Sequence, residues 1–241
     1  MLLLAAIVLG KVQAQTIVKN KLLDVYQIDF AHYAEKQEGI NYTPEYLEAY
    51  ETSQRLITAG KLPFTIYAHA DYGYQVERSI DTTIGIMQYR ADKFMRIHGK
   101  TALMLGFKDL SGHDFYYASE AITDSNKVYA VITLTDDTMT VAGYSCRLAV
   151  VSYSSTAVRY GDTKMDMELW YAPGLPAFYG SGFDYLQKIP GAALFIVYDT
   201  GQNIRLGYKA KTVLKQKKPL SFFELPEGTE IIYPVKGPPM R

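Results

Sequence analysis

Catalysis and metal binding would depend most on the histidine and acidic side chains of this chain. Its histidines form no H-x-H or H-E-x-x-H pattern that would place two ligands on one face: they are His32, His69, His98 and His113. Its grouped carboxylates are of kinds that turns and strand exteriors use routinely: they are Asp136, Asp137, Asp162, Asp166 and Glu168. A carboxylate pair that hydrolyses glycosides is defined by its spatial separation, for which the sequence offers no argument. We therefore predict no catalytic residue, no metal site and no cofactor.

The single cysteine, Cys146, is the remaining candidate for nucleophilic chemistry. It lies in an alternating segment, where Leu148 and Val150 share its face of a strand. The segment that begins at Gly143 starts like a nucleophile elbow, but Arg147 stands where that sharp turn requires glycine. We interpret Cys146 as a small buried side chain, and a lone cysteine cannot form an intramolecular disulfide.

A group of large aromatic side chains is the candidate ligand-binding site. It lies in a segment interrupted by glycine and proline, and its members are Trp170, Tyr171, Phe178, Tyr179, Phe183 and Tyr185. Large apolar side chains in such a loop either form the mouth of an apolar concavity or close the open end of a sheet as part of its core. The first alternative predicts that a lipid or another hydrophobic small molecule binds there. The second predicts a plug, which is the alternative that we favour.

The composition excludes some partners and favours β structure. The chain is 48% hydrophobic and 21% charged, so it has enough apolar side chains to bury a core. Its 25 basic and 25 acidic residues leave a formal net charge of zero, so we expect no nucleic-acid partner. The 21 tyrosines and 10 phenylalanines are typical of strands, on which one ring face packs while a hydroxyl group reaches water.

The N-terminal residues predict export. Residues 2–9 form an apolar core, and Val12-Gln13-Ala14 resembles a cleavage site, so we expect a signal peptide at 1–14. The alternative is a buried first strand. No stretch reaches about 18 apolar residues, so no transmembrane span is predicted. We expect one β-rich domain at 15–233, a Pro/Gly-rich tail at 234–241, and a periplasmic or secreted location.

One helix and many strands are expected. Thr43 stands at an N-cap position, Pro44 at the first helical position, and Gly60 closes the helix about four turns later. Period-two alternation predicts strands at 26–30, 64–74, 80–89, 93–98, 103–107, 115–119, 127–135, 140–153, 164–171, 194–199 and 205–214. Turns are expected at 111–114 and 200–203. Successive strands at short spacing favour an antiparallel meander.

The one basic patch begins within the last predicted strand and continues beyond it. Its members are Lys209, Lys211, Lys215, Lys217 and Lys218. Lysine on an exposed edge strand commonly prevents pairing with other edges. The minority alternative is a surface that binds anionic lipid.

The C-terminal half carries motifs in a recognisable order. Gly143-Tyr144-x-Cys146-x-x-Ala149 resembles the G-Y-x-C-x-x-A signature of the GLPGLI family of exported Bacteroidetes proteins. Residues 169–173 (LWYAP) resemble that family's aromatic-proline strand end, and residues 189–193 (IPGAA) occupy the place of its name-giving motif, with Lys188 in place of the leading glycine. Residues 225–232 (LPEGTEII) are similar to the end of the neighbouring DUF4412 domains.

This resemblance implies a fold and a class of function. It implies a LolA-like, mainly β (α+β) protein in which an antiparallel, strongly curled sheet or half-barrel wraps around one or two helices. Such a sheet would leave an apolar concavity. We expect an exported, non-enzymatic binding protein of the bacterial envelope that carries a lipid or acyl ligand. The alternative is a protein-interaction module with a filled core and an envelope protein as partner, and a hydrolase ranks third.

Overall fold

The computed structural model describes residues 21–77, 83–84, 87–97, 100–109, 111–118, 130–153, 165–178, 188–199, 204–225 and 227–232. The expected signal peptide, the turn at 200–203 and the C-terminal tail lie outside these residues. The elements in chain order are β1 (Leu22–Lys36), α2 (Pro44–Thr58), β2 (Phe64–Ala68), β3 (Tyr72–Glu77), β4 (Thr83–Ile84), β5 (Met87–Ile97), β6 (Lys100–Asp109), β7 (Asp114–Ala118), β8 (Ala130–Val141), β9 (Tyr144–Tyr153), β10 (Met165–Ala172), β11 (Ala192–Asp199), β12 (Ile204–Pro219), the 3-10 turn η3 (Leu220–Phe222) and β13 (Glu230–Ile232).

The protein belongs to the mainly β class, as the sequence predicts. The described strands form one sheet in the order β13-β7-β6-β5-β3-β2-β1-β12-β11-β10-β9-β8, with β4 paired to β5 off this path. Among the described pairs, β13 with β7 is parallel and the others are antiparallel. The prediction of a strongly curled half-barrel is wrong, because the sheet is open and its terminal strands β13 and β8 do not meet.

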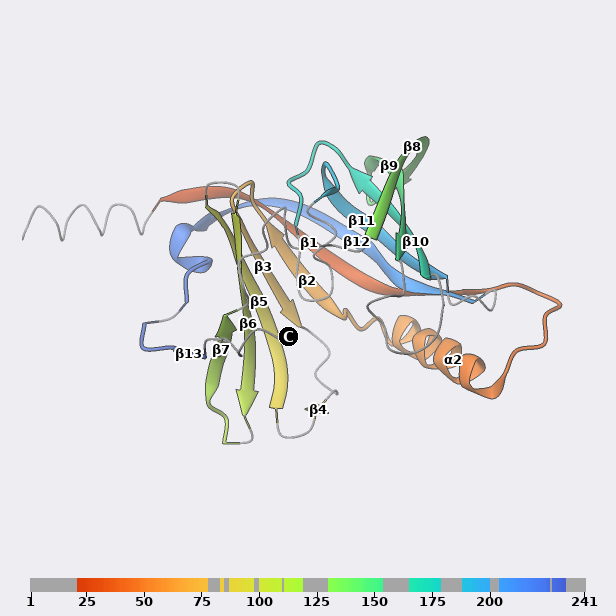
Figure 1. Cartoon of the computed structure of the whole chain (residues 1–241), viewed down its shortest axis with the longest axis horizontal. Coiled ribbons are helices and arrows are strands. Elements are labelled where there is room, and N and C mark those ends of the chain that lie inside the picture. Colours follow the sequence, from red (N-terminus) through yellow and green to blue (C-terminus); the bar gives the residue numbers. More distant parts are fainter. Residues whose placement is uncertain are drawn as a thin grey trace, which may run out of the picture.

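The long pair of β1 and β12 forms the middle of the sheet. Their ladder runs from Leu22 opposite Pro219 to Lys36 opposite Ile204, with one bulge beside Asp29. Strands β2, β3, β5, β6 and β7 extend the sheet on the β1 side, and β11, β10, β9 and β8 extend it on the β12 side (Figure 1). Because this pair joins residues from near the two ends of the described chain, it connects the strands on the β1 side with those on the β12 side in one continuous sheet.

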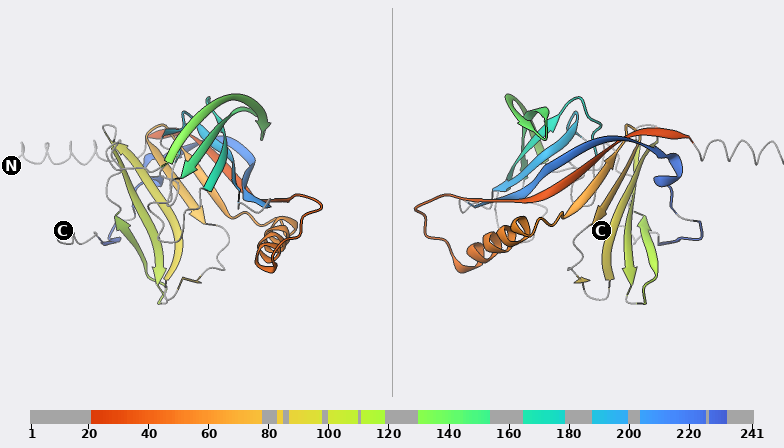
Figure 2. Two further views of the ribbon diagram at one scale, coloured as in Figure 1. Left: turned by 45° about the vertical axis from the view of Figure 1, so that its right-hand side comes forward. Right: turned by 180° about the vertical axis from the view of Figure 1, so that it is seen from behind.

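The helix α2 begins at Pro44, as expected from its sequence, and lies beside one end of the β1–β12 pair (Figure 2). The side-chain amide of Gln54 donates a hydrogen bond to the backbone carbonyl of Ala34 at 3.1 Å. The Lys36 ammonium lies 5.1 Å from the centre of the Tyr50 ring. None of the helical residues is fully buried. The helix therefore flanks the sheet, and the sheet does not wrap around it.

The core changes from one face of β1 to the other along the strand. Leu23 and Val25 are buried on one face, whereas Ile28 and Phe30 are buried on the opposite face, since side chains alternate along a strand. The first pair joins a small cluster with Tyr67 and the residues after β12. The second pair joins the main core, which β2, β9, β10, β11 and β12 complete.

Two predicted strands are hairpins in the structure. The segment 64–74 divides into β2 and β3, and the His69 N–H donates to the carbonyl of Tyr72 at 2.9 Å in the turn. The segment 140–153 contains the two-residue turn between β8 and β9. There Ala142 and Gly143 have φ angles of 49° and 83°, the left-handed pair of a type I′ turn. Alternation continues through such a short turn, so the pattern alone did not reveal it.

Candidate functional site

The predicted aromatic site does not converge on one cavity in the described residues. Trp170 and Tyr171 are consecutive in β10, so their side chains point to opposite faces of the sheet. Trp170 is half-buried, whereas Tyr171 is only 3% exposed. Phe178 is 2% exposed. The other three predicted site residues, Tyr179, Phe183 and Tyr185, lie outside the described residues.

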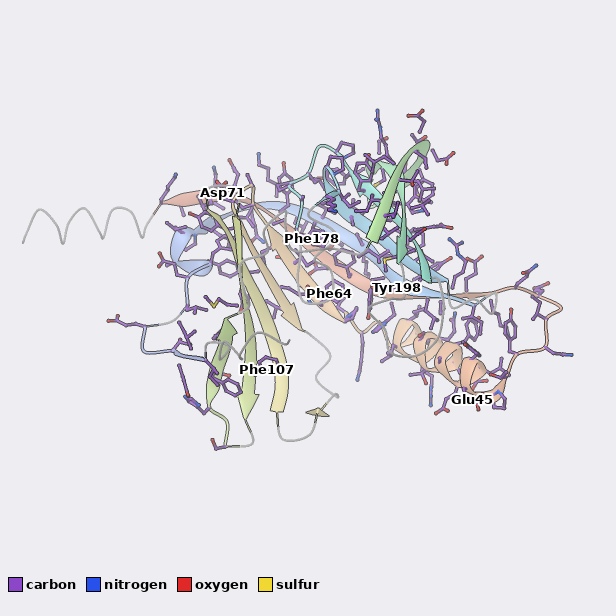
Figure 3. All side chains as sticks on the ribbon, viewed as in Figure 1. Glu45, Phe64, Asp71, Phe107, Phe178 and Tyr198 are labelled. Carbon is purple, nitrogen blue, oxygen red and sulfur yellow. The ribbon has the colours of Figure 1, made fainter. Side chains whose placement is uncertain are left out.

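Phe178 packs into the main core. Its ring centre lies 6.0 Å from that of Phe30 in an edge contact, and the Phe30 ring lies 4.8 Å from the Phe64 ring. Figure 3 shows Phe64 and Phe178 near the middle of the molecule. Leu175 and Ile189, from the same connection between β10 and β11, are also buried. The described part of this connection therefore covers the core, which favours the plug over the mouth.

Gly191 lies where the segments 169–173 and 189–193 meet. Its backbone lies so close to the end of β10 that an added Cβ atom would stand 2.2 Å from the Ala172 carbonyl oxygen and 2.9 Å from the Cα of Pro173. A larger residue would need backbone movement to fit. Ala172 also pairs with Ala192 in the ladder of β10 and β11. The two motifs thus meet in space and form a structural joint.

A polar network crosses the middle of the sheet, where the sequence analysis had singled out no residue. Asp29 accepts hydrogen bonds from the hydroxyl groups of Thr65 on β2 at 2.7 Å and Thr212 on β12 at 2.8 Å. The Gln27 amide donates to both Asp29 carboxylate oxygens at 3.1 Å and accepts from Gln216 at 2.8 Å. Thr65 is fully buried. The network therefore ties β12 to β1 and β2 through side chains.

A second network joins the other end of the β1–β12 pair. Arg205 contacts the carboxylates of both Glu35 and Glu168, and the Tyr33 hydroxyl donates to Glu35. Burial, followed by this hydrogen bond to Glu35, raises the pKa of Tyr33 to about 12. The pair of carboxylates is neutralised in part by the guanidinium between them, so the group has the features of a structural ion-pair network.

Four of the five lysines of the basic patch lie on a stretch of β12 that no second described strand covers, and the fifth, Lys209, pairs with β11. β11 pairs with β12 only from Arg205 to Lys209, so in the described residues 210–219 have β1 as their one neighbouring strand. Lys217 lies 2.9 Å from the Asp24 carboxylate and Lys215 lies 3.9 Å from it. The hydrogen bond from Lys217 is the main cause that lowers the pKa of Asp24. The role of these lysines as a guard against edge pairing stays a prediction.

Strand β8 ends the described sheet on the other side. Val131 is 66% exposed and Leu134 is 49% exposed, and the strand contains no lysine, arginine or proline. Its ladder with β9 is interrupted between Leu134 and Thr138. There Asp136 and Asp137 are exposed and form no ion pair within the described chain. A long edge strand with apolar side chains and free backbone groups is a pairing surface. The sequence signal for this edge is the absence of lysine, arginine and proline from residues 130–141, which was not used to predict it.

The nucleophilic and metal-binding candidates remain separate. Within the described ranges, no three or more His, Cys, Asp and Glu side chains are arranged to hold a metal ion. Burial lowers the pKa of both His32 and His69 and raises that of the Cys146 thiol. His98 lies outside the described residues and His113 is exposed. A raised thiol pKa disfavours the reactive thiolate, which agrees with the interpretation of Cys146 as a core residue.

An open pocket of about 670 Å³ lies at the connection between β1 and α2. It is lined by polar and charged residues together with Ile40, Tyr42 and Leu47. Tyr42 donates a hydrogen bond to the carbonyl of Gln37 across the same connection at 2.7 Å.

In the described residues, no helix is long and apolar enough to cross a membrane.

The fold and these surfaces define a class of protein: a mainly antiparallel, open β-sheet protein with one flanking helix in its described part. No family model and no curated protein matches the chain. Its structure is similar to that of PNGF-II in crystals of space group C2, with a TM-score of 0.50 and 15% identity over 88% of this chain and 31% of PNGF-II. The P21 form gives a TM-score of 0.50 and 13% identity over 88% of this chain and 32% of PNGF-II. The chain thus spans about a third of PNGF-II, and at this identity the likeness concerns the fold alone.

Proposed function

We propose that this chain is an exported, non-enzymatic protein-interaction module, and that β8 binds an extended segment of its partner. The observation that carries the proposal is the β8 edge, where Val131 and Leu134 are exposed on a strand without lysine or proline. A partner strand would pair with the outward backbone groups of β8, and its own apolar side chains would cover these two residues. Export rests on the sequence of residues 1–14.

The packing of the aromatic loop supports a module of this kind more than a carrier of hydrophobic ligands. A carrier needs large apolar side chains that face an interior space. Tyr171 and Phe178 are instead buried among core residues, with Phe178 against Phe30. The expectation of a lipid ligand therefore has no geometric support from the described members of the predicted site.

A labelled, neutral eight-residue peptide that alternates valine and threonine tests the proposal. We expect the wild-type protein to bind it, measured by fluorescence anisotropy, and the Val131→Lys, Leu134→Lys variant to lose about tenfold or more in affinity, since lysine at an edge opposes pairing. The matched control is Leu22→Lys with Gln37→Lys, which adds the same two charges at exposed positions away from β8. The proposal fails if the peptide does not bind, or if the β8 variant binds as well as the control.

A further inference from the structure

A second strand edge of this protein is a candidate partner for β8 of another copy. Residues 210–219 of β12 pair with β1 on one side and have no second strand neighbour in the described structure. Strand β8 ends the order of described strands, so no described strand pairs with its outer side. Each copy therefore presents two edges to which another strand can add.

The two edges carry opposite charges. The β12 edge has four lysines and, across the ladder, two acidic residues, of which Asp29 is held in the side-chain network with Thr65 and Thr212. The six residues are Lys211, Lys215, Lys217, Lys218, Asp24 and Asp29. The β8 edge has Asp136 and Asp137 and no basic residue. The basic residue of the β8–β9 hairpin, Arg147, stands on the inner strand β9, opposite Thr138. Opposite charges at two edges favour the pairing of unlike edges over that of like edges.

The exposed apolar side chains lie at the same two edges. The large hydrophobic residues that stand exposed in the described structure are Val131 and Leu134 on β8, Leu214 on β12, and Leu22 opposite Pro219 at the end of the β1–β12 pair. Leu134 and Asp137 are three positions apart in the sequence, as are Lys211 and Leu214. An antiparallel pairing that brings Asp137 beside Lys211 also brings Leu134 beside Leu214. Both stretches are irregular in their own ladders, between Leu134 and Thr138 in β8 and at Lys211 in β12, so the pairing brings these side chains near one another without fixing an exact register.

We propose that this protein assembles head to tail, with β8 of one copy paired to residues 210–219 of β12 in the next copy. The inference rests on the proposed function, because it names the segment that β8 binds. Such an interface joins two different surfaces, so it builds open chains, which leave one β8 edge and one β12 edge free at their ends, or closed rings, which leave neither edge free. The lysines oppose pairing of β12 with β12, and the aspartates oppose pairing of β8 with β8.

Charge reversal tests the inference by sedimentation velocity on the full chain. We expect the wild type to assemble in a concentration-dependent manner. The Asp136→Lys, Asp137→Lys variant has two basic edges and the Lys211→Glu, Lys215→Glu variant has two acidic edges, so each alone should be monomeric. An equimolar mixture should assemble again, because each variant then supplies the edge that the other needs. The neutral variants Asp136→Asn, Asp137→Asn and Lys211→Gln, Lys215→Gln should assemble weakly, which guards against a folding defect of the reversed charges.

The outcomes separate the two proposals. A wild type that stays monomeric while the neutral peptide binds at β8 overturns the head-to-tail inference and leaves the proposed function standing. A monomeric wild type that also binds no peptide overturns both. Assembly of either reversed variant alone, or no assembly in their mixture, overturns the inference. As a check of this pairing, Leu134→Cys in one copy and Leu214→Cys in another should form an intermolecular disulfide, whereas Leu22→Cys with Leu134→Cys should not.

Discussion

Strand β8 and the C-terminal half of β12 are two bare edges of one sheet, and they are held in different ways. The β12 edge is attached by side chains, since Thr212 and Gln216 join the network of Asp29 and Gln27, and Lys217 contacts Asp24. Strand β8 is attached mainly by its hairpin ladder with β9. The comparison shows two different kinds of unpaired edge. The β12 edge belongs to an inner strand that side chains anchor, whereas β8 is the last strand of the described sheet.

Removal of the Asp29 carboxylate should have the largest effect on this difference. We expect Asp29→Ala to lower the free energy of unfolding by about 3 kcal/mol, because the buried Thr65 hydroxyl and the Thr212 hydroxyl lose their acceptor. Asp29→Asn, which keeps one acceptor oxygen, should lose less. Thr133→Ala on β8 should change the free energy by roughly 0.5 kcal/mol or less, as for other exposed positions.

Urea unfolding followed by circular dichroism would measure all three variants. An equal loss for Asp29→Ala and Thr133→Ala would show that the side-chain network does not anchor β12. The two edges would then differ in their charges and not in how firmly their strands are anchored.

Local patterns were sufficient for the fold class and for most elements. The helix at 44–58 follows from Pro44 and its amphipathic spacing, and the strands follow from alternation. The central pair was beyond such reasoning, because Asp29 and Thr212 are 183 residues apart and no local signal encodes their pairing. The curled architecture that the resemblance implied was wrong for the same kind of reason, because no local signal shows which strands end the sheet and whether they meet.

The candidate site shows a different limit. Alternation already places Trp170 and Tyr171 on opposite faces, so this part of the predicted cluster could have been divided from sequence. The burial of Phe178 could not, because an aromatic residue in a Gly/Pro-rich loop has the same pattern whether it packs inward or faces a ligand. The β8 edge was hidden for another reason: the predicted strand ends at Thr135, residues 136–139 lie in no predicted strand, and Thr140 and Val141 belong to the next one.

Lysine removal from the β12 edge should have an intermediate effect. In a background with β8 blocked by Val131→Lys and Leu134→Lys, we expect the additional change of Lys211 and Lys215 to threonine to produce dimers, because two β12 edges no longer repel each other. The matched control is Lys209→Thr, since Lys209 lies in the part of β12 that β11 covers. Sedimentation velocity measures the result, and a monomer in every case would contradict an anti-pairing role for these lysines.

The smallest effect concerns the ion pair that anchors the end of the β12 edge. The pKa of Asp24 is lowered from 3.8, first by the hydrogen bond from Lys217, so a carboxyl ¹³C titration of Lys217→Met should show this pKa rising toward its ordinary value. Lys211→Met is the control and should leave it unchanged. Because the folded-state pKa is depressed, the pair contributes stability above the ordinary pKa and loses that contribution as the pH falls through the lowered value. An unchanged Asp24 titration in Lys217→Met would mean that Lys217 does not anchor this end of the β12 edge through Asp24.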